Sequence, residues 1–151
     1  MNITLRKANK SDTENIFQLA TDPIVRENSF NKNEISFEHH KRWFEEKIYD
    51  QNTIYLVAEE NGSFVGQIRF DIEKKSAILN ISINKRYRNK GFGKIIIELA
   101  INYLMKNKID LNKVIAKVIN KNTGSRILFE NCGFKLIKND NFNSKYICKL
   151  K

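Results

Sequence analysis

Residues 77–106 read AILNISINKRYRNKGFGKIIIELAINYLMK, and the fold follows from this stretch. Its first part, Ala77 to Ile83, is rich in aliphatic and β-branched side chains, which predicts a strand. From Gly91 to Asn107 the pattern becomes helical, with one narrow polar stripe at a spacing of four: Lys94, Glu98, Asn102 and Lys106. A helix of this kind is largely buried. Because a further strand follows at residues 113–119, the two strands should be parallel neighbours joined by a right-handed crossover.

The segments on either side complete a mixed sheet. Apolar and β-branched runs predict the other strands at residues 3–6, 53–59, 64–70, 134–137 and 145–150. Asn61 and Gly62 form a strong hairpin signal between two of these runs. Capping residues and helical periodicity predict further helices at residues 11–20, 36–48 and 122–132, whereas Pro23 should interrupt the chain. We therefore expect a mixed α/β (α+β) fold, a single domain over residues 1–151, with a mostly antiparallel sheet and about four helices.

Composition limits the classes of function. Lys and Arg number 27 against 17 Asp and Glu, which gives a formal charge of +10 and favours an anionic ligand. The lysines are scattered and no RNA-binding aromatic signature occurs, which argues against nucleic acid as the main partner. The two cysteines lack zinc-site spacing, so no metal is expected. No apolar run approaches about 18 residues, and we expect a cytoplasmic protein with no membrane association.

The turn between the predicted strand and the long helix carries the clearest chemistry. Backbone N–H groups at a helix N-terminus attract anions, and Gly91 and Gly93 would let the backbone approach a diphosphate closely. Arg86, Arg88 and Lys90 add positive charge around the turn. The turn matches neither the G-x-G-x-x-G fingerprint nor the P-loop. Taken alone, it could also be an ordinary loop that closes onto a helix.

Two motifs in the expected order resemble the GNAT superfamily of N-acetyltransferases. The R-x-x-G-x-G run from Arg88 to Gly93 is similar to the loop with which that family grips the coenzyme A pyrophosphate. A second block resembles the family's helix beside the pantetheine arm: Asn122, Ser125, Phe129, Gly133 and Phe134. The resemblance covers nearly the whole chain. It implies the GNAT fold with a parallel splayed central strand pair, acetyl-coenzyme A as cosubstrate, and direct attack by a primary amine in a ternary complex.

The resemblance also implies the cofactor contacts. Ile81 and Ile83 would offer backbone groups to the pantetheine amides, and Asn122 its side chain, although a plain helix N-cap explains Asn122 as well. The pyrophosphate site would comprise Arg88, Asn89, Lys90, Gly91, Phe92, Gly93 and Lys94. Phe129 stands where many members have a tyrosine that protonates the leaving thiolate. Another group or solvent would then serve as the acid, and Cys132 fits a small core residue better than that role.

The general base is open at this stage. His39 and His40 are the only histidines, and their ordinary pKa suits proton removal near neutrality. One of two adjacent residues on a helix usually faces solvent while the other packs. A water could instead be positioned by one of Glu59, Glu60, Asp71 and Asn80.

The acceptor wall is predicted between Thr21 and Phe44. Its T-D-P-I-V-R-E-N-S-F and H-H-K-R-W-F segments resemble bacterial acetyltransferases that modify the 4-amino group of a nucleotide-linked sugar. Arg26 and Arg42 would meet the nucleotide, and Phe30 or Trp43 would stack on it. Alternatively, the aromatic residues are core anchors and the arginines are solvated.

Other acceptors and another class of function stay open. A protein N-terminus or an aminoglycoside fits as well, whereas a polyamine should require an acidic cleft. The rival from another class is a non-catalytic coenzyme A-binding domain, which the phenylalanine at position 129 favours. The sequence also leaves open a homodimer.

Overall fold

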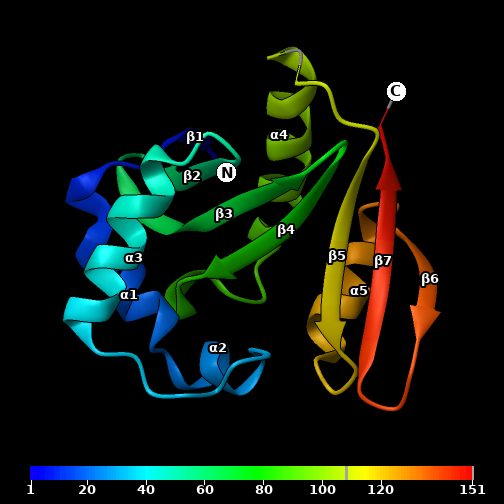
Figure 1. Ribbon diagram of the computed structural model, residues 1–151, viewed down its shortest axis with the longest axis horizontal. Coiled ribbons are helices and arrows are strands. Elements are labelled where there is room, and N and C mark those ends of the chain that lie inside the picture. Colours follow the sequence, from blue (N-terminus) through cyan, green and yellow to red (C-terminus); the bar gives the residue numbers. More distant parts are fainter. Residues whose placement is uncertain (108, 151) are drawn as a thin grey trace.

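One mixed sheet organises the molecule (Figure 1). The computed structural model describes residues 1–107 and 109–150, and within them seven strands lie in the order β1-β2-β3-β4-β5-β7-β6. The strands are β1 (Ile3–Lys7), β2 (Thr53–Glu60), β3 (Ser63–Glu73), β4 (Ser76–Ile83), β5 (Lys113–Ile119), β6 (Lys135–Asn139) and β7 (Asn143–Lys149). All pairs are antiparallel except β4–β5, which is parallel. The predicted fold class and the crossover between parallel neighbours are confirmed.

Helices cover both faces of the sheet. They are α1 (Thr13–Ala20), α2 (Pro23–Glu27), α3 (Phe37–Tyr49), α4 (Phe92–Lys106) and α5 (Thr123–Asn131), with 3₁₀ turns at Lys10–Asp12 and Lys85–Tyr87. The described residues thus hold five α-helices where about four were predicted. The helix that was missed is α2, because Pro23 does not interrupt the chain but occupies the first helical position. Asp22 caps that helix by accepting hydrogen bonds from the N–H groups of Ile24 and Val25.

Local signals account for several other boundaries. Ser36 caps α3 as predicted, and Gly133 follows α5 with a φ of 86° as a left-handed cap. The first helix begins at Thr13 with Asp12 as its N-cap residue, one of the two residues predicted for that role, although the Asp12 side chain makes no capping hydrogen bond to α1. A short 3₁₀ turn that was not predicted precedes the helix; Asn9 caps this turn, and Asp12 at its third position completes a capping box.

Two apolar clusters hold the layers together. One lies between the sheet and α4 and α5, and includes Phe70, Ile96 and Phe129. The other lies under α1 and α3 on the opposite face, where Ile16 and Phe44 pack against Tyr55 and Val57 of β2. The helix pattern of residues 91–107 is confirmed, because all four members of the polar stripe on α4 are exposed while Ile96 and Ile97 are fully buried.

The sheet opens at its centre. Antiparallel pairing of β3 with β4 continues to Gly66 and Ile83, whereas parallel pairing of β4 with β5 ends at Leu79 and Ala116. Figure 1 shows the two strands diverging beyond that point. Part of β4 therefore has a strand neighbour on one edge only.

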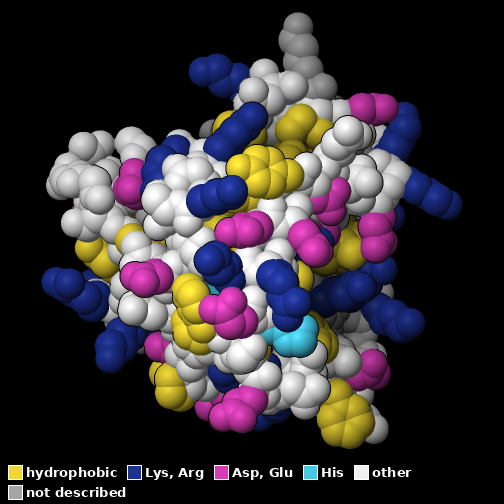
Figure 2. Space-filling model, turned by 60° about the vertical axis from the view of Figure 1, so that its left-hand side comes forward, with side chains coloured by type: hydrophobic (Ala, Val, Ile, Leu, Met, Phe, Trp, Pro, Cys, Tyr) yellow, Lys and Arg dark blue, Asp and Glu magenta, His cyan; other side chains and the backbone are white. Residues whose placement is uncertain are grey.

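The excess positive charge does not form a single patch on the face around α1 and α3. Figure 2 shows Lys and Arg interspersed with Asp and Glu there. Within residues 1–107 and 109–150 no helix has the length and apolar character needed to cross a membrane. The same residues contain no group of three His, Cys, Asp or Glu side chains placed to hold a metal ion.

Candidate active site

A cleft of about 1070 Å³ opens where β4 and β5 separate. One side is formed by the end of α1, by α2 and by the loop that leads to α3. The opposite side is formed by the start of α4, the end of β5 and α5. Side chains of β3 and β4 form its floor. The cleft therefore reaches both faces of the sheet through the gap between the two parallel strands.

The backbone of β4 supplies hydrogen-bonding groups to this cleft. Asn84 N–H donates to the carbonyl of Val65 on β3, at 2.8 Å. Because backbone groups alternate along a strand, those of Ile81 and Ile83 face away from β3 and into the gap. Of these groups, the Ile83 carbonyl is engaged by another described residue, since it accepts a hydrogen bond from Nε of Arg88 at 2.8 Å. Ile81, rather than both residues equally, therefore offers a complete pair of backbone groups.

The start of α4 has the geometry of an anion site. Gly91 precedes the helix with a φ of 86°, and Asn89 has a φ of 59°. Glycine offers no side chain to cap the helix, so the N–H groups of its first turn, from Phe92 onward, stay available for a ligand. A Cβ at Gly93 would lie 3.0 Å from Leu128 and 3.3 Å from Ile83, so this glycine lets α4 pack closely against α5 and β4.

Arg88 is held by the protein rather than being mobile. Besides its bond to the Ile83 carbonyl, its Nη2 lies 3.2 Å from Oδ1 of Asp22, and the Arg88 side chain is only 20% exposed. The arginine thus connects the cap of α2 to the end of β4. This placement shows that the positive charge at position 88 is held in place by the fold, although Nη2 is buried without a hydrogen-bond partner among the described residues. Lys90 is exposed and does not line the cleft, and its Nζ donates to the carbonyl of Arg86.

Helix α5 forms one edge of the cleft with its N-cap residue, Asn122, and with the buried ring of Phe129. The side chain of Asn122 accepts from the N–H of Ser125 at 3.2 Å and donates to its hydroxyl at 2.9 Å. Both residues line the cleft, so the capping role is observed and a ligand contact is compatible with it. Phe129 is 4% exposed and packs against Phe134 and Tyr146, with ring centroids 5.3 and 6.3 Å away.

The two histidines of α3 have different environments, as neighbours on a helix should. His40 is 4% exposed and packs among Phe17, Trp43 and Phe44. Burial lowers its pKa, so it is neutral near pH 7. Its Nε2 is buried without a hydrogen-bond partner among the described residues, which places it poorly for proton exchange with a substrate. His39 is exposed and lines the cleft.

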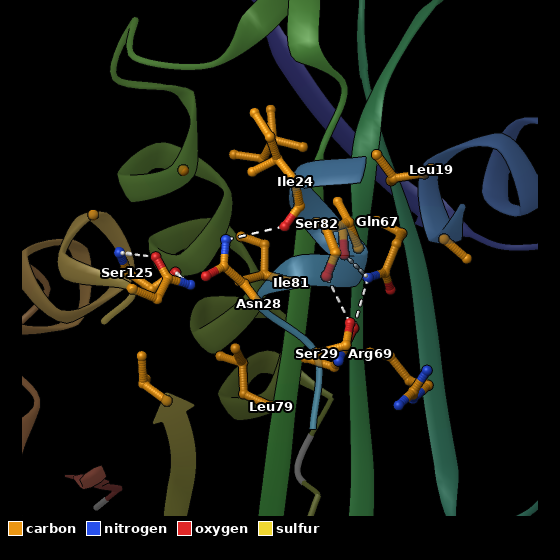
Figure 3. Close-up of a pocket in the computed structure, with 18 of the residues that line it drawn as sticks. Leu19, Ile24, Asn28, Ser29, Gln67, Arg69, Leu79, Ile81, Ser82 and Ser125 are labelled. Carbon is orange, nitrogen blue, oxygen red and sulfur yellow. Dashed lines mark hydrogen bonds between the residues drawn. The ribbon is translucent and has the colours of Figure 1, made fainter. Parts of the chain in front are cut away.

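A polar group on β3 and β4 forms the floor on the side that faces α1 and α3 (Figure 3). Nε2 of Gln67 donates to Oδ1 of Asn80 at 2.8 Å and to Oγ of Ser82 at 3.2 Å. The side-chain oxygen of Gln67, Oε1, is buried and has no hydrogen-bond partner in the part of the chain that the structure describes. Beside it, Arg69 pairs directly across the strands with Asn80.

Arg69 is fixed on three sides. Its Nε donates to Asp71 at 3.2 Å, and its guanidinium carbon lies 5.1 Å from the ring centroid of Trp43 and 5.7 Å from that of Tyr55. Burial raises the pKa of Tyr55 to about 12, against the opposing effect of the arginine. Tyr55 is therefore a neutral phenol beside Arg69 at the floor of the cleft.

Residues 2–135 match the family model described as the acetyltransferase (GNAT) domain. The chain belongs to the GNAT acetyltransferase family. It is 27% identical over 136 residues to an SPbeta prophage-derived uncharacterized N-acetyltransferase, YokL, of Bacillus subtilis strain 168, in an alignment that covers 88% of this chain and 76% of the relative. An N-acetyltransferase activity follows from this membership.

Solved structures support the GNAT fold over the whole chain. The spermidine N-acetyltransferase of Vibrio cholerae, in complex with coenzyme A and spermine, superposes with a TM-score of 0.88 at 22% identity, covering 98% of this chain and 95% of the other. A domain from Methanocaldococcus jannaschii gives a TM-score of 0.84 at 22% identity, covering 99% of each chain. At these identities the likeness establishes the shared fold.

Several predicted residues of this GNAT domain do line the cleft, on both sides. On the cofactor side they are Ile81, Ile83, Arg88, Asn89, Gly91, Phe92, Gly93, Lys94, Asn122 and Phe129. On the acceptor side they are Arg26, Phe30, His39, His40, Trp43 and Asn80. The guanidinium of Arg26 donates to the carbonyls of Asn31 and Asn33, so it stabilises the loop before α3.

Other predicted residues lie elsewhere. Arg42 borders a separate shallow depression with Glu45 and Tyr49, because it points away from the cleft on α3, and we do not retain it as an acceptor ligand. Glu59 pairs with Arg6, and Asp71 with Lys47 and Arg69. Neither of these carboxylates lines the cleft, and Glu60 and Cys132 do not line it either.

The sequence analysis missed four polar residues that line this GNAT cleft: Glu34, Gln67, Arg69 and Ser82. Glu34 is the only carboxylate among the described residues that line it. Alternation of polar side chains at 67, 69 and 71 within an apolar strand was a signal available for two of the four, because polar groups on an inward face need partners.

Proposed function

We propose that the protein transfers the acetyl group of acetyl-coenzyme A to a primary amine of a small molecule, by direct attack within a ternary complex. The observation that carries this proposal is the separation of β4 from β5 directly before the uncapped start of α4. The gap suits an extended pantetheine arm, because Ile81 offers it backbone groups. The first-turn N–H groups of α4 suit the pyrophosphate at the end of that arm.

Orientation supplies much of the proposed catalysis. An amine held on the floor near Asn80 would meet a thioester held along β4, and such alignment replaces a bimolecular encounter. The N–H of Ile81 is placed to stabilise the developing oxyanion. His39 and Glu34 are the titratable groups on the acceptor side that a water or an amine could reach, so we propose one of them as the base, directly or through water.

The leaving thiolate needs a proton from a group other than residue 129. Phenylalanine has no proton to donate, and Cys132 lies outside the cleft with a pKa that burial raises to about 11. We propose that solvent at the open end of the cleft protonates coenzyme A. Loss of the usual donor at this position is also the feature that favours the second candidate, a domain that binds coenzyme A without turnover.

The electrostatics of the cleft bear on the acceptor. Five Lys and Arg side chains line the cleft against one carboxylate among the described residues, and two of the five also pair with carboxylates outside it: Arg26, Lys94, Lys117, and the paired Arg69 and Arg88. A polyamine is the acceptor named for the Vibrio cholerae structure, but a polycation should be repelled by such a lining. We propose a neutral or anionic acceptor, and a nucleotide-linked 4-amino sugar remains the candidate that the sequence resemblance favours.

Calorimetric titration and a turnover assay test the proposal together. We expect acetyl-coenzyme A to bind wild-type protein at micromolar strength, and a Gly91→Trp variant, which blocks the turn, to bind far more weakly. Release of coenzyme A should then be followed with nucleotide-linked 4-amino sugars and with spermidine. Binding without turnover on any amine would select the non-catalytic alternative, and faster turnover of spermidine would overturn the proposed acceptor class.

A further inference from the structure

We infer that Arg69 and Asn80 form a subsite for an anionic group, a carboxylate or a phosphate, carried by the acceptor amine itself. This inference rests on the proposed acetyl transfer and names the class of acceptor. The two side chains lie directly across from each other on neighbouring strands, and both line the cleft. Each presents free N–H donors on the same part of the floor.

The charge at this place is not fully neutralised within the protein. Asp71 is shared by two cations, because its Oδ1 lies 3.2 Å from Nζ of Lys47 and its Oδ2 lies 3.2 Å from Nε of Arg69. One carboxylate between two cations leaves a net charge of +1. The Arg69 side chain is 16% exposed; its Nε donates to Asp71, and its guanidinium also lies within hydrogen-bonding reach of the Tyr55 hydroxyl. A guanidinium carries five N–H donors, so donors remain for a ligand beyond these two contacts.

The donors are also held in place before any ligand arrives. The guanidinium plane is restrained by the rings of Trp43 and Tyr55 and by Asp71. On the other strand, Oδ1 of Asn80 accepts a hydrogen bond from the buried side-chain amide of Gln67. The side-chain nitrogen of Asn80 is therefore the atom that can donate to a ligand. Preorganised donors lose little freedom on binding, and a planar guanidinium suits the two oxygens of a carboxylate or phosphate.

The position sets the distance between the anionic group and the amine. Asn80 immediately precedes Ile81, whose backbone faces the gap proposed for the thioester, and Arg69 lies one strand away, at a spacing of about 4.8 Å. The anionic group should thus lie roughly 5–8 Å from the reacting nitrogen. Both an amino acid-like acceptor and the phosphate side of a nucleotide-linked amino sugar satisfy this distance.

Trp43 gives a readout that does not depend on turnover. It is the only tryptophan of the chain and lies against Arg69, so its emission should report occupancy of the subsite. Acetate and inorganic phosphate, titrated separately at constant ionic strength into protein saturated with acetyl-coenzyme A, should each cause a saturable change. The change should be absent in Arg69→Met, weaker in Arg69→Lys and intact in Lys41→Met, which removes a charge from an exposed position of α3 outside the cleft.

Matched pairs of acceptors distinguish the two sources of the anionic group. β-Alanine is compared with β-alaninamide, and a nucleotide-linked 4-amino sugar with the free amino sugar. For one of these pairs, kcat/KM should favour the charged member by roughly 10- to 100-fold, as a charge-assisted hydrogen bond requires, and Arg69→Met should abolish the preference. If Trp43 emission does not change in wild-type protein, or changes equally in Arg69→Met, the proposed subsite is wrong even if amines are acetylated. A saturable response without turnover of any amine would instead support the subsite and refute the proposed function.

Discussion

Gly91 provides the most direct test of the proposed cofactor site. Its φ of 86° is a conformation that an L-residue adopts at an energetic cost of roughly 1–2 kcal/mol. A Cβ at this position would have no close neighbour, because the nearest atom is the Cε of Met1 at 4.0 Å. Gly91→Ala therefore isolates backbone strain from steric overlap.

The strain can be measured in two assays. If the free protein keeps the turn, Gly91→Ala should lower Tm by about 2–8 °C, since about 2–4 °C corresponds to 1 kcal/mol in a domain of this size. If the free protein relaxes the turn, the same energy should appear on binding, as an increase of about 5- to 30-fold in the Kd for acetyl-coenzyme A. Differential scanning calorimetry and calorimetric titration give the two values.

Gly133 is the matched control for Gly91. It has the same φ of 86° and no atom within 4 Å of the added Cβ, but it does not line the cleft. Gly133→Ala should lower Tm by a similar amount and leave the Kd unchanged. If Gly91→Ala leaves both Tm and Kd at wild-type values, the turn is not needed in its observed conformation and the assignment of the pyrophosphate site fails.

Three further predictions concern stability and reactivity. Asn122→Ala removes the cap of α5 and should destabilise the fold by about 1 kcal/mol in denaturant titrations, whereas Asn122→Ser should recover most of the loss. Burial alone would raise the pKa of Asp12, but hydrogen bonds from Arg6 and from a backbone N–H outweigh it and lower the pKa below its usual 3.8. The stabilisation is then complete above pH 3.8 and is lost as the pH falls through the lowered value, so Asp12→Asn should be less stable at neutral pH and flatten the acid limb of an unfolding curve. Burial raises the pKa of both Cys132 and Cys148, so a thiol reagent at pH 8 should label native protein far more slowly than unfolded protein, and rapid native labelling would contradict this environment.

Periodicity and turn chemistry were sufficient to predict the sheet. The Asn61–Gly62 pair sits at the β2–β3 hairpin with φ values of 50° and 86°, and the narrow polar stripe marked α4 as buried. Helix α2 was missed because a proline in the sequence is compatible both with the first position of a helix and with an interruption between helices. Only the Asp22 side chain, which accepts from two N–H groups, distinguishes the two cases.

The cofactor side of the cleft was more predictable than the acceptor side, for a physical reason. The proposed diphosphate site consists of backbone N–H groups and glycines that are close together in the sequence, so a short motif is enough to predict it. The acceptor floor joins side chains that are far apart in sequence, such as Trp43 and Arg69, through strand register. Local patterns cannot show such a pairing. Arg42 illustrates the same limit, because its neighbour Trp43 faces the cleft while Arg42 itself does not.

Strand β4 explains how one short segment can serve two ligands. Along a strand, successive side chains point to opposite faces while successive backbone groups point to opposite edges. Asn80 and Ser82 direct their side chains to the acceptor floor and their backbone groups to β3. Ile81 and Ile83 do the reverse, with side chains packed in the cluster beneath α4 and backbone groups toward the gap. A shift of one residue in the β3–β4 register would bury the polar pair and expose the isoleucines, so the same hydrophobic pattern that fixes the fold also fixes which ligand each residue can meet.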